Sequence, residues 1–158
     1  MLERCYSDNY HSKENYNGRV TVCDEWHNYQ TFAEWYHNNH IDGWQLDKDI
    51  CKSKIYSPEA CHFLPKELNT FFTSRRHYRG NTPVGVSQRE VGGSYEVSIS
   101  DGSKGESLYL GSYKTLEEAF NVYKCAKVVA LNKLILKHKD MFPQRTLEVL
   151  TSYEFEPY

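Results

Sequence analysis

The strongest constraint on the fold of this chain is a run of three short β-type segments that leads directly into one long helical segment. The β-type segments are VGVSQ at 84–88, SYEVSIS at 94–100 and SLYLGSY at 107–113. Gly92-Gly93 and DGSKG at 101–105 separate them, and both have the composition of hairpin turns. Because hairpins join neighbouring antiparallel strands, we expect a three-stranded antiparallel sheet here.

The helical segment begins at a capping box, in which Thr115 is followed three residues later by Glu118. The sequence predicts a helix over about 116–139 that this capping box opens. A further helix is expected over about 143–152. Small residues on one face would let the long helix lie close to the inner face of the sheet, where Ile99 and Leu110 are expected. This helix face is expected to hold Ala119, Tyr123, Ala126, Val129, Ala130 and Leu134.

The first half of the chain mixes shorter patterns. Residues 20–29 indicate a strand that leads to a turn, and residues 30–38 carry Phe32, Trp35 and Tyr36 at helical spacing. Residues 44–50 alternate as a strand would, which would place Asp47 and Asp49 on one face. A helix over 65–73 would begin at Pro65, a residue pre-organised for a first helical position. The fold class that follows is α+β.

The net charge of −2 does not advertise nucleic-acid binding, but the charge is unevenly distributed. Residues 1–64 carry 6 Lys and Arg against 10 Asp and Glu, and residues 65–158 carry 13 against 11. Local positive potential, which is what DNA binding needs, is expected around Arg75, Arg76 and Arg79. Lysines also recur along the long helix, where they indicate either a DNA contact or a solvated helix face; these are Lys124, Lys127, Lys133, Lys137 and Lys139.

No apolar run is long enough to span a bilayer, and the first residues have no apolar core of a signal peptide. We therefore expect a cytoplasmic protein without a membrane partner. The odd number of cysteines and the lack of a CxxC pair favour reduced, packed thiols over disulfides. The five are Cys5, Cys23, Cys51, Cys61 and Cys125.

Residues 85–126 resemble the DNA-binding domain of the Apetala-two/ethylene-response-factor family. The resemblance rests on GVSQR at 85–89, SYEVSIS at 94–100 and YLGSYKTLEEAF at 109–120, followed by Tyr123 and Ala126. In that family a three-stranded sheet lies in the major groove, braced from behind by a helix. The resemblance implies DNA-binding roles for Ser87, Arg89, Tyr95, Ser98, Ser100, Lys104, Ser107 and Tyr109.

This chain departs from the plant pattern at several of these positions. Serine stands at 87, 100 and 107 where the family carries arginine, and tyrosine replaces tryptophan at 95 and 109. Fewer ion pairs to phosphate imply a weaker, less salt-dependent affinity for DNA. A sheet-on-helix module that binds a protein partner is the alternative.

Residues 19–74 resemble the HNH-type endonuclease region of phage proteins. The matching pieces are VCDEWHNYQTFAEW, LDKDI, YSPEAC and PKELN. HNH chemistry needs a residue that holds one divalent metal, usually Mg²⁺, a histidine that activates water, and an orienting asparagine. The resemblance places Asp47 at the metal position and Asn69 at the last asparagine of the helix.

Two of the matched positions are wrong for this chemistry. Lys48 stands where the general-base histidine is expected, and an exposed lysine is protonated at neutral pH. Ala60 stands where an asparagine is expected. An altered site remains an alternative, in which Asp47 and Asp49 bind Mg²⁺ and His62 approaches them across the turn. Cys5, Cys23 and Cys61 would suit Zn²⁺ with one histidine, but the missing CxxC pair favours buried free thiols.

The expected organisation is therefore an HNH-nuclease-like module over 1–74, with a ββα-metal arrangement and possibly degenerate chemistry. A basic linker follows over 75–81, and an Apetala-two-like DNA-binding domain with a helical extension over 82–158. The favoured hypothesis is a phage-type protein that binds double-stranded DNA and has lost or weakened nuclease activity. One alternative is an active Mg²⁺-dependent endonuclease with an altered site. The other is a phage regulator or anti-defence protein that binds a host protein.

Overall fold

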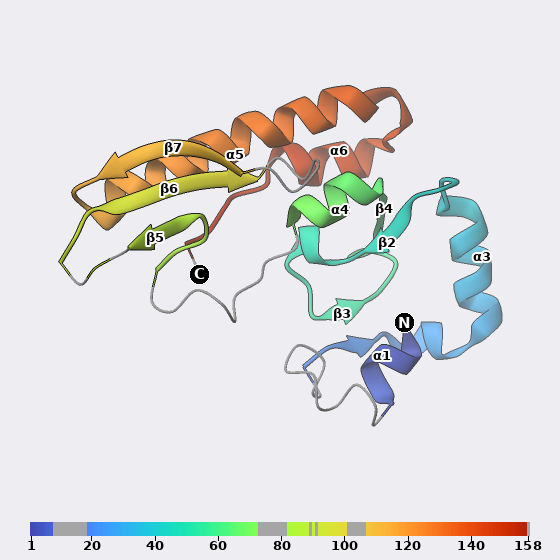
Figure 1. The fold of residues 1–158 in the computed structure, drawn as a ribbon. Coiled ribbons are helices and arrows are strands. Elements are labelled where there is room, and N and C mark those ends of the chain that lie inside the picture. The colour runs from blue at the N-terminus through green and yellow to red at the C-terminus, as the bar shows by residue number, and fades with distance from the viewer. Residues whose placement is uncertain (8–18, 73–81, 89, 91, 101–106, 158) are drawn as a thin grey trace. The chain divides into compact units, whose positions relative to one another are not determined.

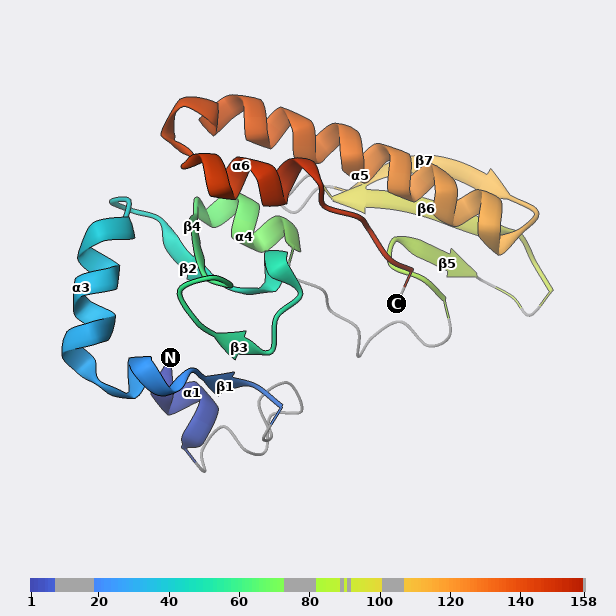
Figure 2. The same cartoon turned by 180° about the vertical axis from the view of Figure 1, so that it is seen from behind.

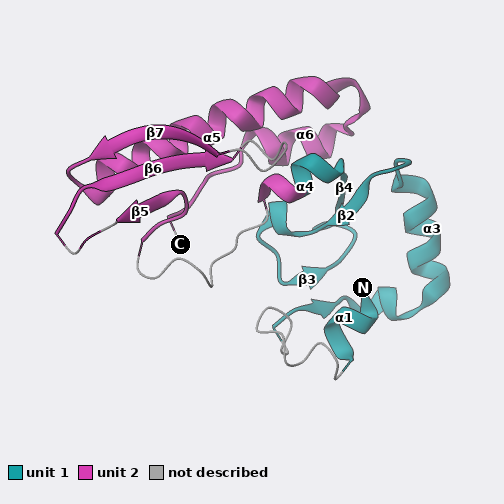
Figure 3. Ribbon diagram, in the orientation of Figure 1, with its two compact units in different colours: residues 1–69 teal, residues 70–158 magenta. Residues whose placement is uncertain are grey.

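The computed structural model describes residues 1–7, 19–72, 82–88, 90, 92–100 and 107–157 (Figure 1). Contacts divide the chain into an N-terminal unit, residues 1–69, and a C-terminal unit, residues 70–158 (Figure 3). Both units combine helices with short strands, which confirms the expected mixture of helix and sheet.

The N-terminal unit contains two small sheets of two strands each. In the first, β1 (Thr21–Val22) pairs in parallel with β3 (Ile55–Tyr56). In the second, β2 (Gln45–Asp47) pairs antiparallel with β4 (His62–Leu64). Strands this short are marginal alone, so side-chain packing around them must supply most of their stability.

The helices of this unit are short as well. They are α1 (Leu2–Tyr6), the 3₁₀ helix η1 (Asp24–His27), α3 (Tyr29–Asn39), the 3₁₀ helix η2 (Asp49–Cys51) and α4 (Lys66–Phe72). The helices expected over 30–38 and 65–73 are thus present as α3 and α4. Asn28 caps α3 because its side-chain oxygen accepts the backbone N–H of Gln30 at 2.9 Å.

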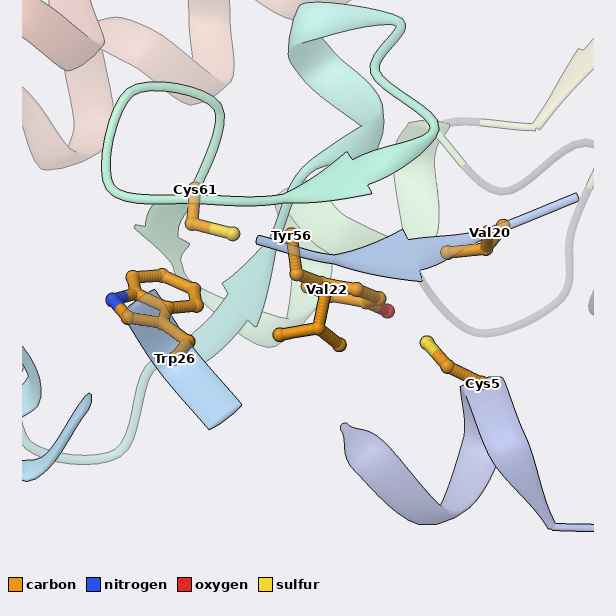
Figure 4. Packing of buried hydrophobic residues seen from close by; sticks show 6 residues of the cluster. All are labelled: Cys5, Val20, Val22, Trp26, Tyr56 and Cys61. Carbon is orange, nitrogen blue, oxygen red and sulfur yellow. The ribbon is translucent and has the colours of Figure 1, made fainter. Parts of the chain in front are cut away.

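Trp26, on η1, is the largest side chain that is fully buried in the core of the N-terminal unit. Phe32 and Trp35 of α3 pack against its ring, at centroid distances of 5.1 and 4.7 Å. In Figure 4, Val22 and Tyr56 lie between the thiols of Cys5 and Cys61. Both thiols therefore serve as small apolar side chains of one core.

The C-terminal unit is built on an antiparallel sheet with strand order β5-β6-β7, as expected. The strands are β5 (Val86–Gln88), β6 (Tyr95–Ser100) and β7 (Ser107–Tyr113). One face packs on the long helix α5 (Leu116–His138), which lies along the sheet in both views (Figures 1 and 2). The 3₁₀ helix η4 (Lys139–Met141) and α6 (Gln144–Thr151) complete the unit.

The capping box predicted at the start of α5 is present. The Thr115 hydroxyl accepts the Glu118 N–H at 3.2 Å, and the Glu118 carboxylate accepts the Thr115 N–H at 3.3 Å. The buried residues of α5 recur at every fourth position: Ala119, Tyr123, Lys127, Leu131 and Ile135. Val129 was expected on this face, but it is 55% exposed because it lies two residues from Lys127, on the other side of the helix.

Lys127 is the charged member of this buried row. Its ammonium donates a hydrogen bond to the backbone carbonyl of Phe71 at 3.0 Å and lies 3.5 Å from the centroid of the Phe71 ring. Carbonyls in the last turn of a helix lack partners within that helix. The hydrogen bond from Lys127 of α5 to the Phe71 carbonyl therefore stabilises the C-terminal end of α4. The tail of the chain packs here too, since Phe155 and Tyr153 contact the rings of Phe71 and Phe72.

Among the residues that the structure describes, none of the helices combines the length and apolarity needed to cross a membrane.

Candidate functional site

The outer face of the sheet, opposite α5, carries most of the residues for which the sequence predicts DNA contacts. Val86, Val97 and Ile99 point into the core, so strand alternation turns their neighbours outward. The exposed outer-face residues are Ser87, Ser98, Ser100, Ser107, Tyr109 and Ser112. Tyr109 is 58% exposed, although its ring is large and partly apolar.

Tyr95 is the exception, and its expected position on the outer face is wrong. Its register partner is Tyr113, and its ring packs partly buried against the core between sheet and helix. The reason is geometric, because Tyr95 lies two positions before Val97 on β6 and therefore shares the inner face with it. The pairing with β7 also skips Leu110, so that Val97 pairs with Gly111 while Ser98 pairs with Tyr109. This bulge keeps Leu110 partly buried beside Tyr109, which is exposed.

Glu96 occupies the centre of the outer face and was missed by the sequence reasoning. The register pairs it with Ser87 on β5 and with Ser112 on β7. A carboxylate there disfavours contact with phosphate but can accept a hydrogen bond from a base edge. Strand alternation from the buried Val97 turns Glu96 outward, although the family resemblance implied no role for this position.

The positively charged candidates Arg75, Arg76, Arg79, Arg89 and Lys104 lie outside the described residues. In the sequence, all five adjoin the strands of the sheet or precede them. The three linker arginines precede β5, Arg89 follows directly after it, and Lys104 lies in the connection between β6 and β7.

The second candidate site is in the N-terminal unit, where β2 pairs with β4 and α4 follows β4 in the chain. Asp47 and His62 are register partners across the β2–β4 pair, and they are 5% and 4% exposed. On α4, the Asn69 amide donates a hydrogen bond to the Gln45 side-chain oxygen at 2.8 Å. The structure thus brings Asp47 next to His62 and holds Asn69 against the first residue of β2.

Burial is the main reason why the pKa of Asp47 is raised from 3.8 to about 6. The backbone N–H of Ile50, which donates to the Asp47 Oδ1 atom at 3.0 Å, opposes this shift, and the nearby charge of Asp49 adds to it. Asp47 therefore keeps its proton to a higher pH than an exposed aspartate does.

The alternation over 44–50 predicted that Asp47 and Asp49 share one strand face, and this prediction is wrong. The strand ends at Asp47, and Asp49 begins the 3₁₀ helix η2 with a side chain that is 69% exposed. Lys48, expected at an exposed position, is buried instead and its ammonium binds the Asp49 carboxylate. The same ammonium lies 5.2 Å from the centroid of the Tyr56 ring.

This group of side chains does not fit a divalent cation. Mg²⁺ needs several oxygen ligands in near-octahedral geometry, whereas the Asp49 carboxylate is already bound by the Lys48 ammonium. Across the described ranges, no cluster of three or more His, Cys, Asp or Glu side chains is placed to hold a metal ion. Ala60, in the turn before β4, has no metal-binding or hydrogen-bonding side chain to add.

The cysteines considered for zinc lie in and around the apolar core. All five cysteines of the chain are free thiols. Cys5 and Cys61 are buried, and Cys23 packs partly exposed against the same core. Burial raises the pKa of Cys61 to about 12 and raises that of Cys5, which disfavours the thiolate form that zinc requires.

No family model, curated protein or solved structure matches this chain.

Proposed function

We propose that the protein binds double-stranded DNA and that the outer face of β5-β6-β7 enters the major groove. The observation that carries the proposal is the row of exposed hydroxyl side chains on a small sheet whose other face is fixed by α5. The major groove admits a narrow β structure of this kind. Ser87, Ser98 and Tyr109 can each donate to a phosphate or to a base acceptor.

Glu96 would give the face a preference among bases. A carboxylate in the major groove accepts a hydrogen bond from the N4 amino group of cytosine. Because Glu96 lies between Ser87 and Ser112, hydroxyl donors on either side can hold the backbone while the carboxylate contacts a base. We expect sites that contain cytosine at one position to bind best.

The basic residues that flank the strands in sequence would supply phosphate contacts. Arg89 and Lys104 adjoin β5 and the β6–β7 connection, and the arginine cluster at 75–79 precedes the sheet. Such contacts provide affinity that is independent of sequence and falls with salt. They would offset the unfavourable charge of Glu96.

The N-terminal unit is proposed to add contacts without cutting DNA. Lys48 binds Asp49 where a water-activating histidine would be needed, and Ala60 replaces the asparagine. A plasmid-nicking assay with Mg²⁺ or Mn²⁺ tests this part. Nicking that disappears in Asp47→Ala would instead favour an endonuclease with an altered site.

Fluorescence anisotropy with duplex DNA tests the main proposal. Ser98→Leu should weaken binding at least about tenfold, because it removes a donor and adds bulk on the outer face beside Tyr109. Gln144→Leu is the matched control, since it makes a similar change at an exposed position on α6. Glu96→Gln should bind duplexes more tightly overall but discriminate less between them. Equal affinities for wild type and Ser98→Leu would contradict the proposal.

A further inference from the structure

A row of side chains lies exposed along α5, on the side turned away from the sheet. Leu136 is 66% exposed, Val129 55% and Val128 37%, and Cys125 is exposed too. Exposed apolar side chains that gather on one face can mark a surface where another protein binds.

The spacing along this row is that of a coiled-coil seam. Cys125, Val129, Asn132 and Leu136 follow one another at intervals of four, three and four residues, which keeps them on one stripe. We call these four residues the α5 seam. They are distinct from the buried row of α5, Ala119, Tyr123, Lys127, Leu131 and Ile135.

We propose that the α5 seam is the interface between two copies of this chain, whose α5 helices pair antiparallel about a two-fold axis. This inference does not depend on DNA binding. A two-fold interface uses the same surface on both copies, so one seam is sufficient for the pair.

The distribution of charge along α5 selects the antiparallel orientation. Glu117 and Glu118 lie in the first turn of the helix, whereas Lys133 and Lys137 lie near its end. An antiparallel pair places the acidic end of each helix beside the basic end of the other. A parallel pair would place like charges together, and it would also align the two helix dipoles unfavourably.

One register brings opposite charges level and pairs Val129 with Cys125, and it also sets Asn132 level with Val122 and Leu136 level with Glu118 of the second copy. If Leu116 of one copy lies level with His138 of the second copy, the helices overlap over their whole length. Val129 then lies opposite Cys125 of the second copy, as core positions do in an antiparallel coiled coil. Glu117 is then level with Lys137 of the second copy.

The contact would be modest in size. With a rise of about 1.5 Å per residue, a helix the length of α5 extends about 35 Å. One helix pair buries less surface than a standard interface of about 1,600 Å², so we expect a dissociation constant in the micromolar range. Asn132 within the seam would lower affinity but would help to fix the register.

Sedimentation equilibrium of the full chain tests the proposal. The wild type should form dimers, and Leu136→Glu should raise the dissociation constant at least about tenfold. Leu108→Glu is the matched control, because Leu108 is 65% exposed but lies on β7. Circular dichroism should show the same helix content in all three proteins. A monomeric wild type, or equal effects of the two substitutions, would overturn the proposal.

Oxidative cross-linking tests the orientation. Val129→Cys should cross-link to Cys125 of the second copy, whereas the wild type should cross-link poorly because its two Cys125 residues would be about 6 Å apart along the axis. Adding Cys125→Ser should abolish the cross-link. A dimer that cross-links readily through Cys125 alone would show a parallel pair. A cross-link within one chain would show that the N-terminal unit covers the seam, and either result would overturn the proposal.

The pairing of acidic and basic helix ends can be tested separately. Lys133→Glu should weaken the dimer, because it places an acid within one turn of Glu118 of the second copy, whereas Lys133→Arg should not. Dimers that are insensitive to both substitutions and to salt would contradict the antiparallel assignment.

Discussion

Gly85 lies against the ring of Tyr123 so closely that a Cβ atom at Gly85 would be 2.0 Å from the Cδ2 and Cε2 ring atoms. The backbone of Gly85 is also in the left-handed region, with φ of 75°. Its carbonyl accepts the N–H of Ser98 at 3.0 Å. The contact between the start of β5 and α5 therefore helps to place a residue of the outer face.

Gly85→Ala is expected to destabilise the chain by about 3 kcal/mol or more, because it adds a steric clash to an unfavourable φ. Gly92→Ala is the control, since Gly92 has a φ of 81° but nothing within 4 Å of an added Cβ. It should cost about 1 kcal/mol from backbone strain alone. Urea denaturation of both variants measures the difference, and equal losses would show that Tyr123 moves aside without cost.

Lys127→Met is expected to lower the free energy of unfolding by about 1 to 3 kcal/mol. The substitution keeps much of the apolar stem but removes the hydrogen bond to the Phe71 carbonyl and the contact between ammonium and ring. Lys139→Met, at an exposed lysine directly after α5, should change stability by less than about 0.5 kcal/mol. If the two variants unfold at the same urea concentration, the buried ammonium contributes nothing to stability.

The raised pKa of Asp47 predicts a pH dependence of stability. The folded chain holds the proton up to about pH 6, whereas the unfolded chain loses it near 3.8, so stability falls as the pH rises through this window. Asp47→Asn keeps an oxygen acceptor for Ile50 but carries no charge. It should exceed the wild type by up to about 3 kcal/mol near pH 7 and match it near pH 4.

The difference between wild-type and Asp47→Asn unfolding curves, measured across this pH range, isolates the contribution of Asp47. Asp42→Asn removes the same charge at an exposed position of the same unit and controls for net charge. A difference curve that stays flat from acid to neutral pH would show that Asp47 ionises as readily in the folded chain as in the unfolded one.

Replacing Arg75, Arg76 and Arg79 by glutamine should weaken DNA binding for every sequence tested. It should also flatten the slope of log affinity against log salt by up to about 3, because each phosphate contact contributes about one counterion. Anisotropy titrations at several salt concentrations measure the slope. An unchanged slope would mean that these arginines do not contact phosphate.

The C-terminal unit was predictable because its signals are local. Glycine turns mark the ends of its strands, and Thr115 with Glu118 marks the start of α5. Lys127 was not predictable as a buried residue, because its partner Phe71 is 56 residues away and a lysine on a helix normally indicates a solvated face. The position of Val129 was misjudged for the same reason, since a buried row through Lys127 excludes it.

At the candidate sites, the outward side chains of one strand were predicted correctly, whereas the end of a strand and the pairing between strands were not. Strand alternation correctly turned Ser98, Ser100 and Tyr109 outward. It failed at Asp49, because the residues after Asp47 bend into a 3₁₀ helix in which the Ile50 N–H binds the Asp47 carboxylate. The pairing of Asp47 with His62 depends on the register of two strands that η2 and β3 separate in the chain, and periodicity carries no information about it.

The division of the chain falls inside α4, between Asn69 and Thr70, and this limits how the protein can be dissected. A fragment that stops at Asn69 would lose the last turn of the helix on which Leu68 is fully buried. A fragment that begins after Phe72 would deprive Lys127 of the Phe71 carbonyl and of the ring beneath it. Fragments prepared for either half should therefore each retain the whole of α4.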